Sequence, residues 1–542
     1  MADESRRRAD RCKRMPTKLL IIGGDAADPS LIESWCKAGD LPNLSALSKR
    51  SRRGRIKNPE GLEAGSAWPT FHTGFEPGRQ PLFDGLRRFD SERYTFGHYS
   101  MDEAPLTIWQ ELSQAGKRCF VLDPPYSHLD TSINGVCIVD WSSHVPARGS
   151  GRLELATCPE NIRDTVLELV GVEPAHGVLC DDNLCETIDD YRRFRDIHLD
   201  RIDKKAKLAK HFLAQETWDY FEVVFSDLHC LGHHLWHIND RGHPRYRADY
   251  EKALGAPLRE AFRALDRAIG TLVQEAGRDT IVVFYASHGM GPQYTGTGLL
   301  DRILDRLEND SPSNEGPSLK GRAREIWRSI PADMREKVES FRKPFKGALS
   351  HPQFLPDRSR RKIFEVYANN GAGGVRLNLR GRESQGLVDP TEYDALLQQI
   401  ERDLLDIVNS DTGEPLVARV IKTREAYRGE FVNAMPDLIV VWNRERPIRS
   451  VTSPKIGTLF QEFADARTGD HTIDGQFWAC GPGITHGLLN ETVSPADFLP
   501  TFRRLLDVPS RPTDGRLISA LLGSVDGSEE YAPQLSRARF ER

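Results

Sequence analysis

Residues 220–237 carry the sequence YFEVVFSDLHCLGHHLWH, in which an apolar run leads directly into one aspartate and four histidines. The run at 220–224 is rich in aromatic and β-branched residues, which predicts a buried strand. In an open α/β sheet, ligands bind beyond the carboxyl ends of the strands. His229 and His233 are four residues apart, so a helix would place both on one face. Imidazole and carboxylate suit zinc and similar ions, and the stretch therefore predicts a metal site that includes Asp227, His229 and His233.

Two histidines of this stretch have a simpler explanation. His234 and His237 are interpreted as buried or surface residues whose hydrogen bonds are satisfied within the protein. We favour metal binding for His229 and His233 because other parts of the chain supply matching partners.

Two further polar residues follow apolar runs in the same way, and a third follows a Gly-Asp pair. Asp25 ends the run at 18–24, His288 follows closely on the run at 280–286, and His471 follows a Gly-Asp pair. Continuous apolar runs of this kind predict central parallel strands that are buried on both faces. Taken alone, Asp25 is explained equally well as a cap on the helix that comes next.

The bulk composition limits the class of protein. The chain has 542 residues, a formal net charge of -5 and nine scattered cysteines without a CxxC pair. The charge argues against a nucleic-acid-binding protein, and the cysteines fit reduced thiols in the cytoplasm. The charged N-terminus lacks the apolar segment of a secretion signal, and no apolar run is long enough to span a bilayer. We therefore expect a cytoplasmic enzyme.

The alternation of apolar and polar segments predicts a large α/β core with insertions. Further strands are expected at 118–122 and 136–140, and residues 247–275 predict one long amphipathic helix. The core sheet is expected to continue through 374–379 and 438–442. We expect a disordered lead at 1–16, core segments at 17–140, 218–296 and 363–510, a helical cap insertion at 141–217, a basic helical insertion at 297–362 and a peripheral tail at 511–542. The basic insertion suits a polyanionic substrate or acidic lipid, but also an ordinary solvated surface.

A series of motifs, in order along the chain, resembles the alkaline phosphatase superfamily. The nearest branch is the type I phosphodiesterase/nucleotide pyrophosphatase group with its phosphohydrolase/phosphomutase-like bacterial relatives. The resemblance implies a three-layer α/β sandwich with a mostly parallel central sheet and helical cap insertions. It also implies two divalent metals and a Ser, Thr or Cys nucleophile that attacks a phosphoryl or sulfuryl centre. The motifs span most of residues 17–505 and are Ile22–Asp25, Leu41–Leu44, Ser66–Gly74, His288–Pro292, Gly371–Glu383, Met435–Val440 and Gly469–His471.

The resemblance assigns metal ligands position by position, with departures from the family pattern. Asp25 matches the first-strand carboxylate, and His288, His233 and His471 match family histidines. His229 stands where the family has the Asp four residues before His233. The site that these residues imply holds one or two ions, Zn²⁺ or Mn²⁺.

Two other departures concern the first metal and the nucleophile. Ser287 replaces the Asp that precedes the histidine at 288, so one site lacks a carboxylate. Asp227 lies two residues before His229 and is either a ligand or a group that orients an imidazole. The family's nucleophile position falls on Ala64, and the nearest hydroxyl is Ser66. We predict Ser66 as the nucleophile, with an ordinary helix N-cap as the alternative role.

These observations favour a metal-dependent hydrolase of phosphate esters. We expect a phosphodiesterase that acts on a phosphodiester or related monoanionic ester, by in-line attack of a serine or a metal-bound hydroxide. One alternative is a phosphoryl or sulfuryl transferase, or a sulfate-ester hydrolase, acting on a carbohydrate or lipid. Another is a non-catalytic metal-containing binding protein. The expected partner is a small-molecule, glycan or lipid phosphate (or sulfate) ester. The Cys-x-Pro-x-Arg motif of cysteine sulfatases is absent.

Overall fold

The computed structural model describes residues 18–85, 87–99, 103–143, 154–173, 185, 187–296, 298–314, 316, 357–366, 371–461 and 467–522. The expected lead at 1–16, most of the basic insertion and the end of the tail lie outside these ranges. Within them, no helix combines the length and apolar character needed to cross a membrane.

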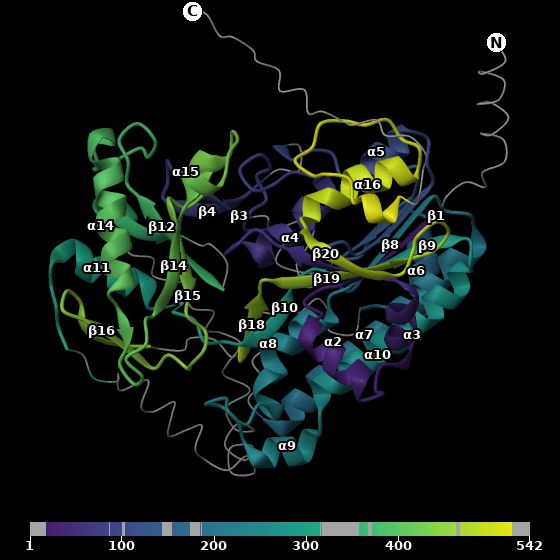
Figure 1. Ribbon diagram of the computed structural model, residues 1–542, viewed down its shortest axis with the longest axis horizontal. Coiled ribbons are helices and arrows are strands. Elements are labelled where there is room, and N and C mark those ends of the chain that lie inside the picture. Colours follow the sequence, from purple (N-terminus) through teal and green to yellow (C-terminus); the bar gives the residue numbers. More distant parts are fainter. Residues whose placement is uncertain are drawn as a thin grey trace, which may run out of the picture.

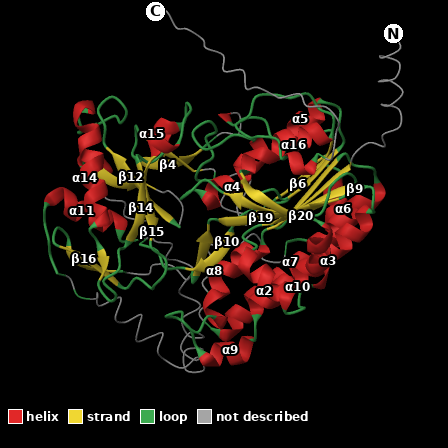
Figure 2. Ribbon diagram, viewed as in Figure 1, coloured by secondary structure: helices red, strands yellow, loops and turns green. Residues whose placement is uncertain are grey.

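The larger lobe is built on a mostly parallel sheet (Figures 1 and 2), which in the described part of the chain has nine strands in the order β20-β2-β19-β9-β1-β8-β5-β6-β7. The strands from β9 to β6 run parallel, whereas β19 and β7 are antiparallel to their neighbours. Their bounds are Lys18–Gly24 (β1), Arg52–Lys57 (β2), Cys119–Leu122 (β5), Gly135–Val139 (β6), Ala156–Cys158 (β7), Tyr220–Phe225 (β8), Thr280–Ala286 (β9), Asp474–Cys480 (β19) and Gly487–Val493 (β20).

Helices cover both faces of this sheet, because the apolar side chains of its central strands alternate between two cores. The predicted three-layer α/β sandwich is therefore confirmed (Figure 1). One layer contains Pro29–Lys37 (α2), Pro42–Arg50 (α3), Ile162–Val170 (α6), Ile188–Gln215 (α7), Asp227–Asn239 (α8), Ala248–Leu254 (α9) and Pro257–Ala276 (α10). The other contains Glu63–Thr73 (α4), Ile108–Gln114 (α5) and Phe498–Leu505 (α16).

The single long helix predicted at 247–275 is wrong, because the structure has two helices there. Gly255 ends α9 with a φ of +66°, a left-handed conformation that glycine adopts without strain. Pro257 then occupies the first turn of α10, where its missing N–H costs nothing.

The strands at 374–379 and 438–442 do not continue the main sheet, contrary to the sequence prediction. They belong to a smaller lobe, which contains a four-stranded antiparallel sheet, β11-β12-β15-β14, and a three-stranded one, β13-β16-β17, among the described residues. Figure 1 shows this lobe in green, beside the larger one. Its elements are Leu300–Asn309 (α11), Ile363–Val366 (β11), Ala372–Leu377 (β12), Tyr393–Leu405 (α14), Val408–Asn409 (β13), Val417–Lys422 (β14), Thr423–Ala426 (α15), Leu438–Trp442 (β15), Ser450–Ser453 (β16) and Gly457–Phe460 (β17).

Buried ion pairs fix the loops of the smaller lobe. Arg376 donates to Glu383 at 2.7 Å, and Arg382 donates to Glu383 and to Asp437. These residues come from two of the motifs that carry the family resemblance, so both motifs contribute to the architecture of this lobe.

Two short antiparallel ribbons complete the described fold. Gly289–Pro292 (β10) pairs with Gly469–Thr472 (β18), at the edge of the larger lobe that faces the smaller one (Figure 1). Arg87–Asp90 (β3) pairs with Thr95–His98 (β4). The first ribbon carries His471.

Candidate metal centre

The parallel strands bring the predicted residues to one edge of the sheet. In the register of β1, β8 and β9, Gly24 lies opposite both Phe225 and Ala286. The residues that follow these strands, among them Asp25, therefore emerge on the same side, as the sequence predicted.

Three histidines from two elements converge at this edge. His229 and His233 lie on one face of α8, with ring centroids 4.5 Å apart, as their spacing predicted. His471 comes from β18, where it pairs with Met290 of β10, and its ring centroid lies 4.7 Å from that of His229 and 4.6 Å from that of His233. One ligand nitrogen from each of the three residues lies within 4.8 Å of the others. We call these three residues the histidine corner.

The histidine corner offers a donor set for a cation. The Nδ1–H of His233 donates to the carbonyl of Gly469 at 2.8 Å, while its Nε2 has no hydrogen-bond partner among the described residues. Burial lowers the pKa of His233 and of His471 well below the usual range, and the nearby Arg467 guanidinium adds to the effect. Neutral imidazole is the form that binds metal. Three imidazoles are a donor set that suits zinc, with a fourth position left for water or substrate.

Asp25, Ser287 and His288 form a second group, which we call the aspartate corner. Asp25 Oδ1 accepts hydrogen bonds from Trp68 Nε1 at 2.8 Å and from Ser287 Oγ at 3.2 Å. His288 Nε2 lies 3.5 Å from the same oxygen, and the His288 ring centroid is 4.7 Å from that of His471. The two corners therefore adjoin. In the aspartate corner, however, other side chains of the protein already bind Asp25 Oδ1.

Asp227 is anchored by helix α7 and is not part of the histidine corner. Its Oδ1 lies 2.8 Å from His198 Nδ1 and 3.3 Å from Arg201 Nε, and its side chain is fully buried. Burial alone would raise the pKa of Asp227, but Arg201 and His198 outweigh it and hold this pKa below the usual value. Lys205, on the same helix, pairs with buried Asp123 at 3.0 Å. The contacts of Asp227 with His198 and Arg201 tie α7 to the start of α8, the helix that carries His229.

The predicted nucleophile lies in the first turn of α4. The N-cap of α4 is Leu62, so the alternative that Ser66 caps this helix is wrong. Ser66 is fully buried, and its hydroxyl donates to the Leu62 carbonyl at 2.7 Å. Glu63, three residues earlier, is also buried, and this burial raises the pKa of its carboxyl to about 7.

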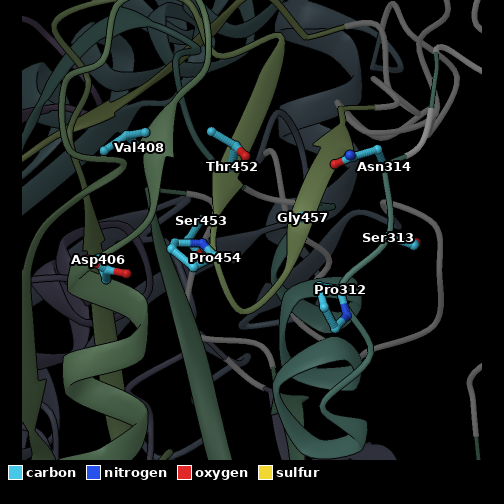
Figure 3. Close-up of a pocket in the computed structure, with 9 residues that line it drawn as sticks. All are labelled: Pro312, Ser313, Asn314, Asp406, Val408, Thr452, Ser453, Pro454 and Gly457. Carbon is cyan, nitrogen blue, oxygen red and sulfur yellow. The ribbon is translucent and has the colours of Figure 1, made fainter.

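A surface depression of about 490 Å³ lies in the smaller lobe, away from these residues (Figure 3). Only one ionisable side chain, Asp406, is in its lining, so it offers no chemistry that resembles the histidine corner. The lining residues are Pro312, Ser313, Asn314, Asp406, Val408, Thr452, Ser453, Pro454 and Gly457.

Sequence reasoning missed four residues at the site. Trp68 binds Asp25, and His198 and Arg201 bind Asp227. No sequence pattern signals these contacts, since the partners lie 26 to 43 residues apart. Glu63 had a usable signal, because it directly precedes the position at which the family carries its nucleophile.

Comparison with known proteins is consistent with this geometry. The sequence model of the family described as "Type I phosphodiesterase / nucleotide pyrophosphatase" matches residues 19–457, most of the chain. No curated protein gave a significant match. The chain therefore belongs to this family of the alkaline phosphatase superfamily and is a phosphoric ester hydrolase of the phosphodiesterase/pyrophosphatase type. The family is typically dependent on divalent metal ions.

Proposed function

We propose that this member of the type I phosphodiesterase/nucleotide pyrophosphatase family is a phosphodiesterase that depends on a metal held by His229, His233 and His471. The observation that carries the proposal is the convergence of three buried ligand nitrogens within 4.8 Å. The ion is zinc or manganese, and three imidazoles favour zinc. When bound, the ion supplies Lewis acidity that stabilises charge developing on the phosphoryl oxygens.

The charge of this site favours an anionic ester. Three neutral imidazoles leave the two positive charges of a divalent ion uncompensated, and the Arg467 guanidinium lies close enough to shift the pKa of His233 and His471. An anion is therefore attracted. A phosphodiester carries one negative charge and is therefore attracted by this site.

Within the proposed reaction, Ser66 is the attacking group. Its hydroxyl must leave the Leu62 carbonyl and turn toward the phosphorus. Asp25 and His288 lie beside the histidine corner and are the residues that would hold a second ion. Asp227 keeps the start of α8 in place. A cytoplasmic location stays a prediction, which rests on the free thiols of the seven described cysteines.

The proposal is tested by metal content together with turnover of bis(p-nitrophenyl) phosphate in the presence of zinc or manganese. His233→Gln should lose the metal and lower kcat/KM by at least about 100-fold, since even outer residues of metal sites contribute 10–100-fold. His234→Gln is the matched control, because His234 is the next residue of the same helix and lies against Phe194, outside the histidine corner. Equal losses in both variants, or turnover of p-nitrophenyl sulfate but of no phosphate ester, would contradict the proposal.

A further inference from the structure

Glu63 is a buried carboxylate at the start of α4, where backbone N–H groups and Arg444 favour its charged form but do not satisfy both of its oxygens. It is the first residue of α4, and its residue surface is 5 % exposed. Its Oε2 atom has no hydrogen-bond partner among the described residues. A carboxylate oxygen removed from water without a partner costs free energy, so such groups mark functional sites more often than structural ones.

The carboxylate of Glu63 lies against the strand that carries His471. Helix α4 packs on β18, and a Cβ atom built on Gly371 would lie 3.0 Å from Glu63 Oε1 and 3.6 Å from the His471 carbonyl oxygen. The same Cβ would be 3.8 Å from Arg444 Nη1, and that guanidinium donates to the His471 carbonyl. Glycine at 371 thus leaves room for the Glu63 carboxylate beside the histidine corner.

Glu63 and Ser66 are also neighbours on α4. Residues three apart lie on the same side of a helix, with Cβ atoms roughly 5–6 Å apart. A serine hydroxyl is a weak nucleophile unless an adjacent base accepts its proton. Ala64, between them, has no group that could serve as that base.

We propose that Glu63 is the catalytic base that accepts the proton of Ser66 as the serine oxygen attacks phosphorus. This inference rests on the proposed phosphodiesterase function. In the first step the Ser66 Oγ–P bond forms and the P–O bond to the leaving group breaks. The Ser66 proton passes to Glu63 and then to the leaving oxygen, which departs as an alcohol or phenol. In the second step water attacks the phosphoserine diester, the Oγ–P bond breaks, and Glu63 transfers a proton from the water to Ser66 Oγ.

The electrostatic surroundings of Glu63 suit transfer of a proton both to and from its carboxylate. Burial and the nearby Asp470 favour the protonated carboxyl, whereas Arg444 favours the carboxylate. A base whose pKa lies close to the working pH can accept and return a proton with small cost in each direction.

The test compares Glu63→Gln with Asp84→Asn in turnover of bis(p-nitrophenyl) phosphate by zinc-loaded protein. Asp84 is the matched control because it is a buried carboxyl beside α4, with its backbone against Gly65, and burial raises its pKa to about 7. We expect Glu63→Gln to lower kcat by about 10²–10⁴-fold, the range of general base catalysis, with zinc content unchanged. Asp84→Asn should stay within about threefold of wild type, because it is not in the proton path.

Two further variants separate the base role from a packing role. Glu63→Asp keeps a carboxylate and should retain more activity than Glu63→Gln. Glu63→Ala should regain activity on addition of sodium formate, because the small acid can occupy the space of the lost carboxylate and accept the proton. If Glu63 had a purely structural role, formate would not restore activity.

The outcomes distinguish this inference from the proposed function. If the wild-type protein turns over the diester but Glu63→Gln does so at a similar rate, the inference is wrong and the proposed function stands. If Glu63→Gln loses zinc, or if formate rescues nothing, Glu63 is a ligand or packing residue and the inference is overturned. A wild-type protein that is inactive with both zinc and manganese overturns the proposed function, and the inference with it.

Discussion

The histidine corner and the aspartate corner adjoin but differ in how their polar atoms are used. In the first, the Nε2 atom of His233 faces the other two imidazoles without a hydrogen-bond partner among the described residues. In the second, Asp25 Oδ1 accepts hydrogen bonds from Trp68 and Ser287. To bind an ion, Asp25 Oδ1 would give up these partners, whereas His233 Nε2 has none to give up among the described residues. We therefore predict one strong metal position, in the histidine corner, and one weak position, in the aspartate corner.

The largest expected effect comes from removing a ligand of the histidine corner. His471→Ala leaves two imidazoles, so we expect loss of the tightly bound ion and, with it, nearly all turnover, because attack by a serine and attack by water both depend on that ion. His288→Ala changes the aspartate corner and should leave that ion in place. Elemental analysis of both proteins checks the difference. Retention of the ion by His471→Ala would show that the histidine corner does not hold it.

Ser66→Ala is the next largest change. If Ser66 attacks phosphorus, the variant should lose several orders of magnitude in kcat with its metal content unchanged. The lost hydrogen bond to Leu62 should cost only about 1 kcal/mol of unfolding free energy. Steady-state kinetics and thermal denaturation measure the two quantities. A folded, metal-loaded variant with near-normal kcat would exclude the nucleophilic role.

Ser287→Asp tests the difference between the two corners, because it adds a carboxylate to the aspartate corner. An added negative charge should strengthen binding of a second ion by roughly tenfold, equivalent to 1.4 kcal/mol. Ser287→Asn is the neutral control of similar shape. Calorimetric titration with zinc measures the affinity of the second site in both variants. No difference between the two variants would mean that the carboxylate is not what this corner lacks.

The smallest expected effect is the pH dependence of metal binding. Burial lowers the pKa of His233 and His471 well below its usual value of about 6.5, so both imidazoles are already neutral between about pH 6 and 8. Metal binding should then release few protons from them, and zinc affinity should change by well under tenfold per pH unit. Competition with a chelator at several pH values tests this. A tenfold or steeper dependence would show that the imidazoles are protonated in the metal-free protein.

Local sequence patterns predicted the parts of the site that depend on neighbouring residues. The spacing of His229 and His233 predicted one helix face, and the runs before Asp25 and His288 predicted buried strands that end together. The break between α9 and α10 was missed, although Gly255 and Pro257 mark it in the sequence.

Contacts between distant segments could not be predicted in the same way. The apolar run at 438–442 suits a strand in either sheet, and only tertiary packing places it in the smaller lobe. Asp227 was predicted to be either a ligand or a group that orients an imidazole, and no sequence pattern showed that His198 and Arg201 would reach it from a helix that begins almost forty residues earlier. Trp68 likewise reaches Asp25 only because α4 packs on the sheet.

We propose that the protein has one strong metal position and that the histidine corner provides it. The metal-to-protein ratio after exhaustive dialysis against zinc-free buffer, in wild type and in His233→Gln, tests this directly. We expect about one tightly bound ion per chain in the wild type and a ratio close to zero in the variant. Two equally tight ions in the wild type, or an unchanged ratio in the variant, would contradict it.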